Sequence, residues 1–263
     1  MDFGIQGKTA IVCGASRGLG QACAEALAGE GVNLVVNARG FDTVFNAARS
    51  IAERYGVEAV PVAADITHPD TPETLMKAAH DRFGGVDILI NNTGGPLPGT
   101  FADCADEEWE KAFRLTLLSA VRMTRAVLPF MRAKGWGRII NLTSIAVKQP
   151  IGGLILSNSL RSAVVGMAKT LSQEAAAHGI TVNNIAPGTF DTERLRDLFE
   201  DRANRQGITA EQARAAAVSA IPMGRLGRPE ELAWLVAFLA SRCASYITGA
   251  TIQIDGGMCA GLL

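Results

Sequence analysis

Short apolar runs alternate with longer helical patterns along the whole chain. The expected strands are apolar on both faces; they are Thr9–Cys13, Asn33–Asn37, Glu58–Val62, Ile88–Asn91, Arg138–Leu142, Thr181–Ile185 and Thr251–Ile254. Strands of this kind belong to a parallel sheet that is covered on both sides. Helical spacing falls between them, near 18–29, 42–55, 71–83, 106–134, 157–178 and 229–241. The pattern predicts an α/β fold with one doubly wound parallel sheet of about seven strands and helices on both faces.

The chain of 263 residues contains no repeat, low-complexity tract or linker, so residues 1–263 are predicted to form a single domain. One segment, residues 191–220, departs from the alternation. It is charged and rich in alanine, with helical spacing but a weak apolar stripe. Two interpretations of this segment stay open: a solvated pair of surface helices, or a mobile lid over a substrate cleft.

Composition excludes several classes of protein. A net charge of −1 gives no electrostatic footprint for nucleic acid or an acidic membrane. The five cysteines include no Cys-x-x-Cys pair, which argues against a zinc site or a disulfide framework and favours a reducing compartment. The first apolar run is too short for a signal peptide, and no segment approaches the roughly 18 apolar residues of a membrane span. We therefore expect a cytoplasmic protein without a metal, nucleic-acid or membrane partner.

A glycine-rich loop joins the first strand to the first helix, with the sequence Gly14-Ala15-Ser16-Arg17-Gly18-Leu19-Gly20. Gly14 permits a tight turn, Gly18 lets the backbone approach a pyrophosphate, and Gly20 allows close packing of the helix. The helix N-terminus favours an anion. A loop of this type at the first strand–helix junction predicts a Rossmann-type dinucleotide site.

The end of the second strand indicates which dinucleotide is bound. A site for NAD offers an acidic residue there to accept from the ribose 2′-hydroxyl. This chain instead has Asn37-Ala38-Arg39. Arg39, together with Arg17 of the glycine loop, can meet a 2′-phosphate through charge-assisted hydrogen bonds. The alternative is that both are ordinary surface arginines. The sequence favours NADP(H).

Further motifs extend over essentially the whole chain: Asp65-Ile66, Asn91-Asn92-Thr93-Gly94, Pro187-Gly188-Thr189-Phe190-Asp191-Thr192 and Asp255-Gly256-Gly257. Together they resemble the short-chain dehydrogenase/reductase family, in particular 3-oxoacyl-acyl-carrier-protein reductases. The resemblance implies that Asp65 contacts adenine and that Thr192 contacts the nicotinamide carboxamide. The implied cofactor residues are Gly14, Ser16, Arg17, Gly18, Leu19, Gly20, Arg39, Asp65, Ile66, Asn92, Gly94, Arg161, Pro187, Gly188 and Thr192.

The catalytic positions of the family are altered in this chain. The family uses a serine, a tyrosine thirteen residues later, a lysine four residues after the tyrosine, and an asparagine on the preceding long helix. Here these positions hold Ser144, Ser157, Arg161 and Thr116. A serine hydroxyl is a far weaker acid than a phenol, and an arginine cannot relay a proton. The resemblance therefore implies a hydride site whose usual proton donor is missing.

Two groups are candidates to supply the proton. Lys148 lies four residues after Ser144, in the loop that covers the reacting carbon in the family. Desolvated beside a cation such as Arg161, it could act as a general acid. A solvated loop lysine is the alternative interpretation. The second candidate is a water resting on Ser157, in the space that the tyrosine ring would fill.

These observations support a divergent NADP(H)-dependent oxidoreductase that reduces a ketone, aldehyde or 3-oxoacyl carbonyl, or oxidises the corresponding alcohol. A nucleotide-binding protein without redox activity, and non-redox chemistry in the same cleft, stay open because fold does not fix function. The family resemblance also implies a homodimer or homotetramer that is formed through the helical patterns near 106–134 and 157–178 and the C-terminal helix and strand.

Overall fold

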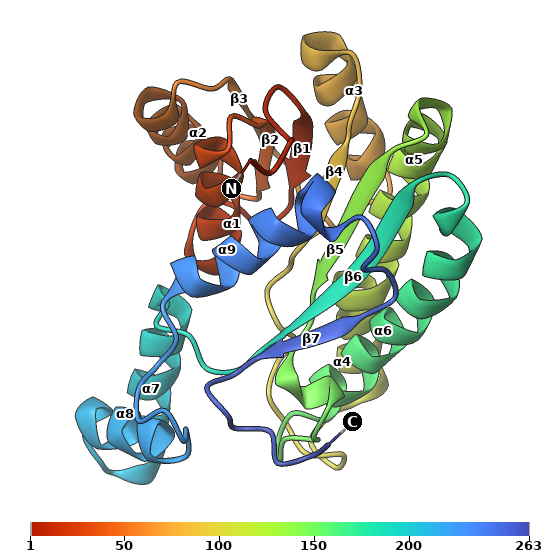
Figure 1. The fold of residues 1–263 in the computed structure, drawn as a ribbon. Helices are drawn as coiled ribbons and strands as arrows, with labels where there is room; N and C mark the ends of the chain where they lie inside the picture. Colours follow the sequence, from red (N-terminus) through yellow and green to blue (C-terminus); the bar gives the residue numbers. More distant parts are fainter. Residues whose placement is uncertain (1, 263) are drawn as a thin grey trace.

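The computed structural model describes residues 2–262, except for the side chains of Arg202 and Arg205. Seven strands form one parallel sheet in the order β3-β2-β1-β4-β5-β6-β7 (Figure 1). The strands are β1 Thr9–Val12, β2 Asn33–Ala38, β3 Ala59–Ala63, β4 Ile88–Asn91, β5 Gly137–Leu142, β6 Ile180–Pro187 and β7 Thr251–Ile254. The predicted α/β fold with a doubly wound parallel sheet is confirmed, and each expected strand is present within two or three residues of its predicted bounds.

Helices cover both faces of the sheet. They are α1 Gly18–Gly29, α2 Phe41–Tyr55, α3 Thr71–Phe83, α4 Asp106–Phe113, α5 Ser119–Lys134, α6 Ile155–Ala176, α7 Glu193–Gln206, α8 Ala210–Ser219 and α9 Pro229–Ala240. One apolar cluster joins the sheet to α1, α2 and α9, and a second joins it to α3, α5 and α6 (Figure 1). This division explains why the strands are apolar on both faces.

The long helix expected at 106–134 is not continuous. A π-helical turn, Arg114–Leu118, separates α4 from α5. Such turns interrupt the regular ladder and are common at functional sites. Sequence spacing did not predict this interruption, because one extra residue in a turn leaves the apolar pattern almost unchanged. The turn contains Thr116, whose side chain is buried.

A ladder of buried asparagines crosses the carboxyl half of the sheet. Asn91, Asn141 and Asn184 are direct register partners on β4, β5 and β6, and Thr251 follows on β7. The amide of Asn91 donates to Asn141 at 2.8 Å, and that of Asn141 donates to Asn184 at 2.9 Å. Asn184 in turn donates to Thr251 at 3.1 Å. Because buried polar groups need partners, each side chain supports the register of the next strand.

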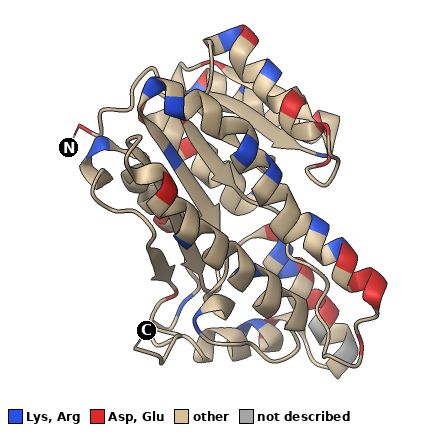
Figure 2. Cartoon of the chain, turned by 90° about the vertical axis from the view of Figure 1, so that its right-hand side faces the viewer, with Lys and Arg blue, Asp and Glu red and all other residues tan. Residues whose placement is uncertain are grey.

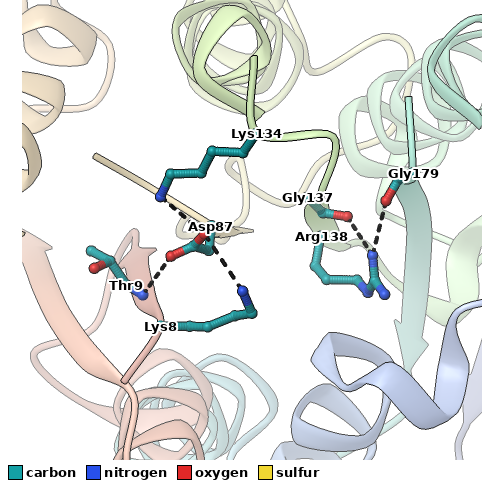
Figure 3. Close-up of polar contacts among 7 residues, drawn as sticks. All are labelled: Lys8, Thr9, Asp87, Lys134, Gly137, Arg138 and Gly179. Atoms are coloured by element: carbon teal, nitrogen blue, oxygen red, sulfur yellow. Dashed lines mark hydrogen bonds and ion pairs between the residues drawn. The ribbon is translucent and has the colours of Figure 1, made fainter. Parts of the chain in front are cut away.

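Charged residues at the opposite end of the strands hold the amino edge of the sheet together (Figure 3). Asp87 accepts from the backbone N–H of Thr9 at 3.0 Å and from the ammonium of Lys134 at 3.0 Å, and Lys8 lies at 3.8 Å. Arg138 is buried and donates to the carbonyl of Gly137 at 2.8 Å, with no acidic partner among the described residues. This edge is structural, and it lies away from the ends of the strands that carry the candidate site.

Residues 191–220 form the helix pair α7 and α8, which extend from one end of the sheet (Figure 1). An apolar cluster separate from those of the sheet joins Phe199 and Ala213 of the pair to Ile221 and Leu226, which follow α8. In the view of Figure 2, basic and acidic residues are interspersed along the outer helices. Throughout residues 2–262, no helix has both the length and the apolar character needed to traverse a lipid bilayer.

Candidate active site

The glycine loop lies at the carboxyl ends of β1 and β4. Gly14 and Gly18 have φ values of +60° and +59°, a conformation that glycine adopts without strain. A Cβ on Gly20 would stand 2.1 Å from the carbonyl oxygen of Gly14, so only glycine lets α1 begin this close to the loop. The amide of Asn92 donates to the carbonyls of Cys13 and Gly14 at 3.2 and 3.1 Å. The loop is thereby fixed to the end of β4.

The beginning of the α7–α8 segment lies against the same loop. A Cβ on Gly18 would meet the methyl group of Thr192 at 3.6 Å. Arg17 and Glu193 form an ion pair at 3.6 Å between largely exposed side chains. Ser16 and Leu19 are half-buried beside them. The structure thus brings Thr192 to the glycine loop.

At the end of β2, Asn37 is buried and donates to the carbonyls of Val62 and Ala64 at 3.1 and 3.0 Å. These hydrogen bonds hold the Asn37 amide within the sheet, so it is not free to bind a ribose. Arg39 is exposed, and Asp65 lies nearby. The backbone N–H of Thr67 is the main cause that lowers the pKa of Asp65, and the charge of Arg39 contributes to a smaller extent. Arg39 is therefore available to a phosphate at this edge.

Ser144 follows β5 and caps a short 3₁₀ helix, Ile145–Val147. Its hydroxyl accepts from the backbone N–H of Ala146 at 3.1 Å and keeps its own proton free to donate. Lys148 ends this short helix. It is half-buried, and its ammonium has no hydrogen-bond or ion-pair partner among the described residues.

Ser157 and Arg161 lie one turn apart on α6, and both are buried. The Nη1 of Arg161 donates to the backbone carbonyls of Leu142 and Thr143 at 2.9 and 2.8 Å. Burial, followed by the positive charge of Arg194, lowers the pKa of Arg161 to about 10, so the guanidinium stays charged at neutral pH. Its Nη1 is therefore committed to the end of β5. Only Nε and Nη2 of Arg161 remain free to donate to a ribose, which limits the cofactor-binding role that the sequence predicted for this residue.

A small cavity of about 20 Å³ adjoins Arg161. Its polar lining includes Asn91, Asn141, Thr143 and Thr116. The hydroxyl of Thr116 is fully buried and has no hydrogen-bond partner in the described part of the chain. A volume of this size holds about one water, and the polar groups around it supply the partners that such a water needs.

The cysteine of the cavity wall and the three histidines of the chain show no sign of a catalytic role. Burial raises the pKa of the Cys13 thiol to about 12, so this residue of the cavity wall stays protonated. His68, His80 and His178 are exposed. Over residues 2–262, no group of three or more His, Cys, Asp or Glu side chains is arranged to hold a metal ion.

Sequence reasoning missed one residue of the site. Arg194 extends from the first turn of α7 and donates to the carbonyl of Gly95 at 3.1 Å. The Pro187–Thr192 motif ends two residues earlier, and nothing in the spacing indicates where the next side chain points. The available signal was Gly94-Gly95, because two consecutive glycines leave room for a long side chain to lie across the backbone.

These elements fit a dinucleotide. The loop carries left-handed glycines at the N-terminus of α1, no acid stands at the end of β2, and two arginines are exposed at that side. Of the expected cofactor residues, Pro187 is buried and Gly188 is half-buried at the end of β6. Ile66 and Asn92 line the cavity beside Arg161.

Comparison with known proteins agrees with this architecture. A family model described as enoyl-(acyl carrier protein) reductase matches residues 14–259. The chain is 37% identical to the 3-oxoacyl-[acyl-carrier-protein] reductase of Vibrio cholerae over 254 residues, which are 97% of this chain and 98% of that protein. It is 34% identical to an NADPH-dependent reductase of Bacillus subtilis over 251 residues, covering 95% and 97% of the two chains.

A solved structure is also similar to this chain over its full length. L-sorbose reductase from Gluconobacter frateurii, complexed with NADPH and L-sorbose, superposes with a TM-score of 0.96 at 36% identity over the full length of both chains. The family model, the full-length relatives and the superposed structure agree with the fold described above. The chain belongs to the short-chain dehydrogenase/reductase family.

Proposed function

We propose that this protein is an NADPH-dependent carbonyl reductase that works without the tyrosine–lysine pair of its family. Its full-length relatives include reductases whose names or complexes specify NADPH. The exposed Arg39 and Arg17, with no acid at the end of β2, favour the 2′-phosphate form of the cofactor. The substrate is a ketone, an aldehyde or a 3-oxoacyl group.

The bound NADPH supplies the hydride, and the protein positions and polarises the carbonyl. The Ser144 hydroxyl donates a hydrogen bond to the carbonyl oxygen of the substrate. The fixed charge of Arg161 stabilises the negative charge that develops there, an effect that is large where water is excluded. Lys148 is the candidate proton donor, because its ammonium has no partner among the described residues and lies in the loop after Ser144.

The small cavity is the observation that carries this proposal. It joins Thr116, which has an orphaned buried hydroxyl, to Arg161 and Thr143 next to Ser144. A water held there would connect the interior of the site to a proton path that does not need a phenol.

Spectrophotometry with NADPH tests the proposal. The panel contains 3-oxoacyl thioesters, ketones and aldehydes, and the loss of NADPH absorbance reports turnover. Turnover that survives Ser157→Ala and falls by about 10²-fold or more in Lys148→Met would support the lysine donor. Lys169→Met, a change at an exposed lysine on α6, is the matched control. Equal loss in both variants would argue against Lys148.

One observation favours a second function, a regulatory or scaffolding protein that binds NADPH without redox activity. Arg161 is held by two backbone carbonyls and cannot exchange a proton at neutral pH. Under this alternative, titration gives tight NADPH binding while the whole panel gives no turnover. Tighter binding of NADH than of NADPH would contradict the roles given to Arg17 and Arg39.

We also propose that residues 191–220 act as a lid and that the protein is a homodimer or homotetramer. The apolar cluster that joins α7 and α8 to Ile221 and Leu226 supports the first point, because it is separate from the two clusters of the sheet. Trp234 on α9 and Tyr246 before the edge strand β7 are exposed, which suits an interface. Hydrogen exchange with and without NADPH tests the lid, and light scattering tests the assembly.

A further inference from the structure

Arg194 crosses from the lid to the loop that follows β4. Its Nη2 donates to the carbonyl of Gly95 at 3.1 Å. A Cβ on Gly94 would stand 3.2 Å from Nη1, and a Cβ on Gly95 would stand 3.1 Å from Nη2. The guanidinium therefore lies against two residues that have no side chains, and its Nε and Nη1 have no hydrogen-bond partner among the described residues.

A second cation reaches the same stretch of chain. Arg161 is 9% exposed and lines the small cavity together with Asn92 and Thr93, which directly precede Gly94. The two guanidiniums thus meet the four residues at the end of β4. Arg161 is buried, and burial, followed by the charge of Arg194, lowers its pKa. The side chain of Arg194 is itself exposed, and the cation that contributes to lowering its pKa, after burial, is Arg17.

No carboxylate balances these two charges. The acids nearest in sequence to Arg194 are already paired, Glu193 with Arg17 at 3.6 Å and Asp191 with Arg196 at 3.1 Å. Within residues 2–262, neither Arg161 nor Arg194 forms an ion pair with a described side chain. Two neighbouring like charges without a counter-ion repel each other, and Arg161 is buried, so the arrangement is suited to an anion that arrives with a ligand.

We propose that Arg194, backed by the fixed charge of Arg161, binds a carboxylate of the substrate, so that the preferred substrate is a short oxo acid rather than a neutral ketone. This inference rests on the proposed reductase function and names its substrate class. The planar guanidinium presents two donors side by side, which match the two oxygens of a carboxylate.

The position of Arg194 favours the substrate over the cofactor as the source of the anion. The glycine loop and Arg17 already provide an anion site at the N-terminus of α1. Arg194 points instead to Gly95, beyond the Asn92–Gly94 stretch that the family motif assigns to the cofactor. An anion on Arg194 therefore lies past that stretch, at the first turn of α7.

Calorimetry on protein loaded with NADP⁺ tests this assignment without turnover, because an oxo compound cannot be reduced by the oxidised cofactor. The ligands are 2-oxobutanoate, 3-oxobutanoate and 4-oxopentanoate, each paired with its methyl ester, and neutral L-sorbose. At least one acid should bind about tenfold or more tightly than its ester. Arg194→Gln should abolish that preference, and Arg194→Lys should retain part of it.

Arg196→Gln is the matched control, since Arg196 is an exposed arginine on the same helix and pairs with Asp191. It should leave the preference intact. The proposal is overturned if no acid binds better than its ester, or if the preference survives Arg194→Gln. An Arg194→Gln variant that instead loses NADPH affinity would assign Arg194 to the cofactor phosphates. Absence of reductase activity would contradict only the proposed function, because binding is measured without catalysis.

Discussion

The Nη1 of Arg161 donates to the backbone carbonyl of Thr143 at 2.8 Å, one residue before Ser144. An arginine on α6 thus holds the end of β5 from which Ser144 extends. Arg161 therefore holds the backbone through hydrogen bonds and also carries a positive charge. Substitutions can separate these two contributions.

Arg161→Met should lower the free energy of unfolding by about 1–3 kcal/mol, because it leaves the carbonyls of Leu142 and Thr143 without this donor in a buried site. Arg161→Lys should cost less, since an ammonium can still donate to one of them. Urea denaturation of the three proteins measures the difference. Equal stability of wild type and Arg161→Met would show that the two hydrogen bonds contribute nothing net.

The double variant Ser157→Tyr with Arg161→Lys should restore the pair that the family uses. We expect its turnover with NADPH to exceed that of the wild type by about 10²–10⁴-fold, the usual contribution of a general acid. The control is Ser157→Phe with Arg161→Lys, which adds the same ring without the hydroxyl. A gain shared by both double variants would mean that the ring, and not its acidity, is responsible.

Thr116→Val removes a buried hydroxyl at nearly constant shape. If the cavity holds a water that takes part in proton transfer, turnover should fall about tenfold, while the NADPH affinity stays unchanged. Thr116→Asn, which installs the family residue, should keep activity. Steady-state kinetics and NADPH titration are measured on both variants. Unchanged turnover in Thr116→Val would remove the cavity from the proton path.

Asp87→Asn should destabilise the amino edge of the sheet. The carboxylate is largely buried, faces Lys134 and Lys8, and accepts from Thr9 (Figure 3). Loss of its charge should reduce the free energy of unfolding by about 1–3 kcal/mol. Asp81→Asn breaks an exposed pair with Lys77 and should cost less than about 1 kcal/mol. Urea denaturation compares the two, and similar losses would contradict the structural role of Asp87.

Acid should weaken the connection between α8 and α9 through Glu231. Hydrogen bonds from Arg225 at 2.7 and 2.8 Å are the main cause that lowers the pKa of Glu231 from 4.5 to about 2. Because the folded pKa lies below the ordinary value, the stabilisation is complete above pH 4.5 and disappears as the pH falls through about 2.

Glu231→Gln should therefore be less stable than the wild type at neutral pH, and the gap should close between pH 4.5 and about 2. Thermal unfolding at several pH values measures the gap. Glu230→Gln, a change at the neighbouring exposed acid, should show no such convergence. A gap that stays constant down to pH 2 would rule out the pair as its source.

The fold could be predicted from the sequence because apolar periodicity depends on local spacing. The runs that became β1 to β7 are apolar on both faces, and only a covered parallel sheet buries both. The glycine loop could also be predicted from the sequence, because the turn at Gly14 and the close packing at Gly20 each require a residue without a side chain.

Directional contacts could not be predicted in the same way. That Arg161 turns its Nη1 to the carbonyls of Leu142 and Thr143 depends on where β5 ends relative to α6. The reach of Arg194 to Gly95 joins residues 99 positions apart. The π-helical turn at Thr116 depends on one extra residue in a helix. Such features follow from tertiary packing and have no period in the sequence.

The apolar cluster of α7 and α8 has a further consequence for how this protein can change. Phe199, Ala213 and Ile221 pack with one another and belong to neither cluster of the sheet. Substitutions at sites without shared partners combine almost additively. Substitutions within this cluster should therefore leave the stability of the two sheet clusters largely unchanged. The helix pair can thus vary from one descendant to the next while the seven-stranded body is inherited intact.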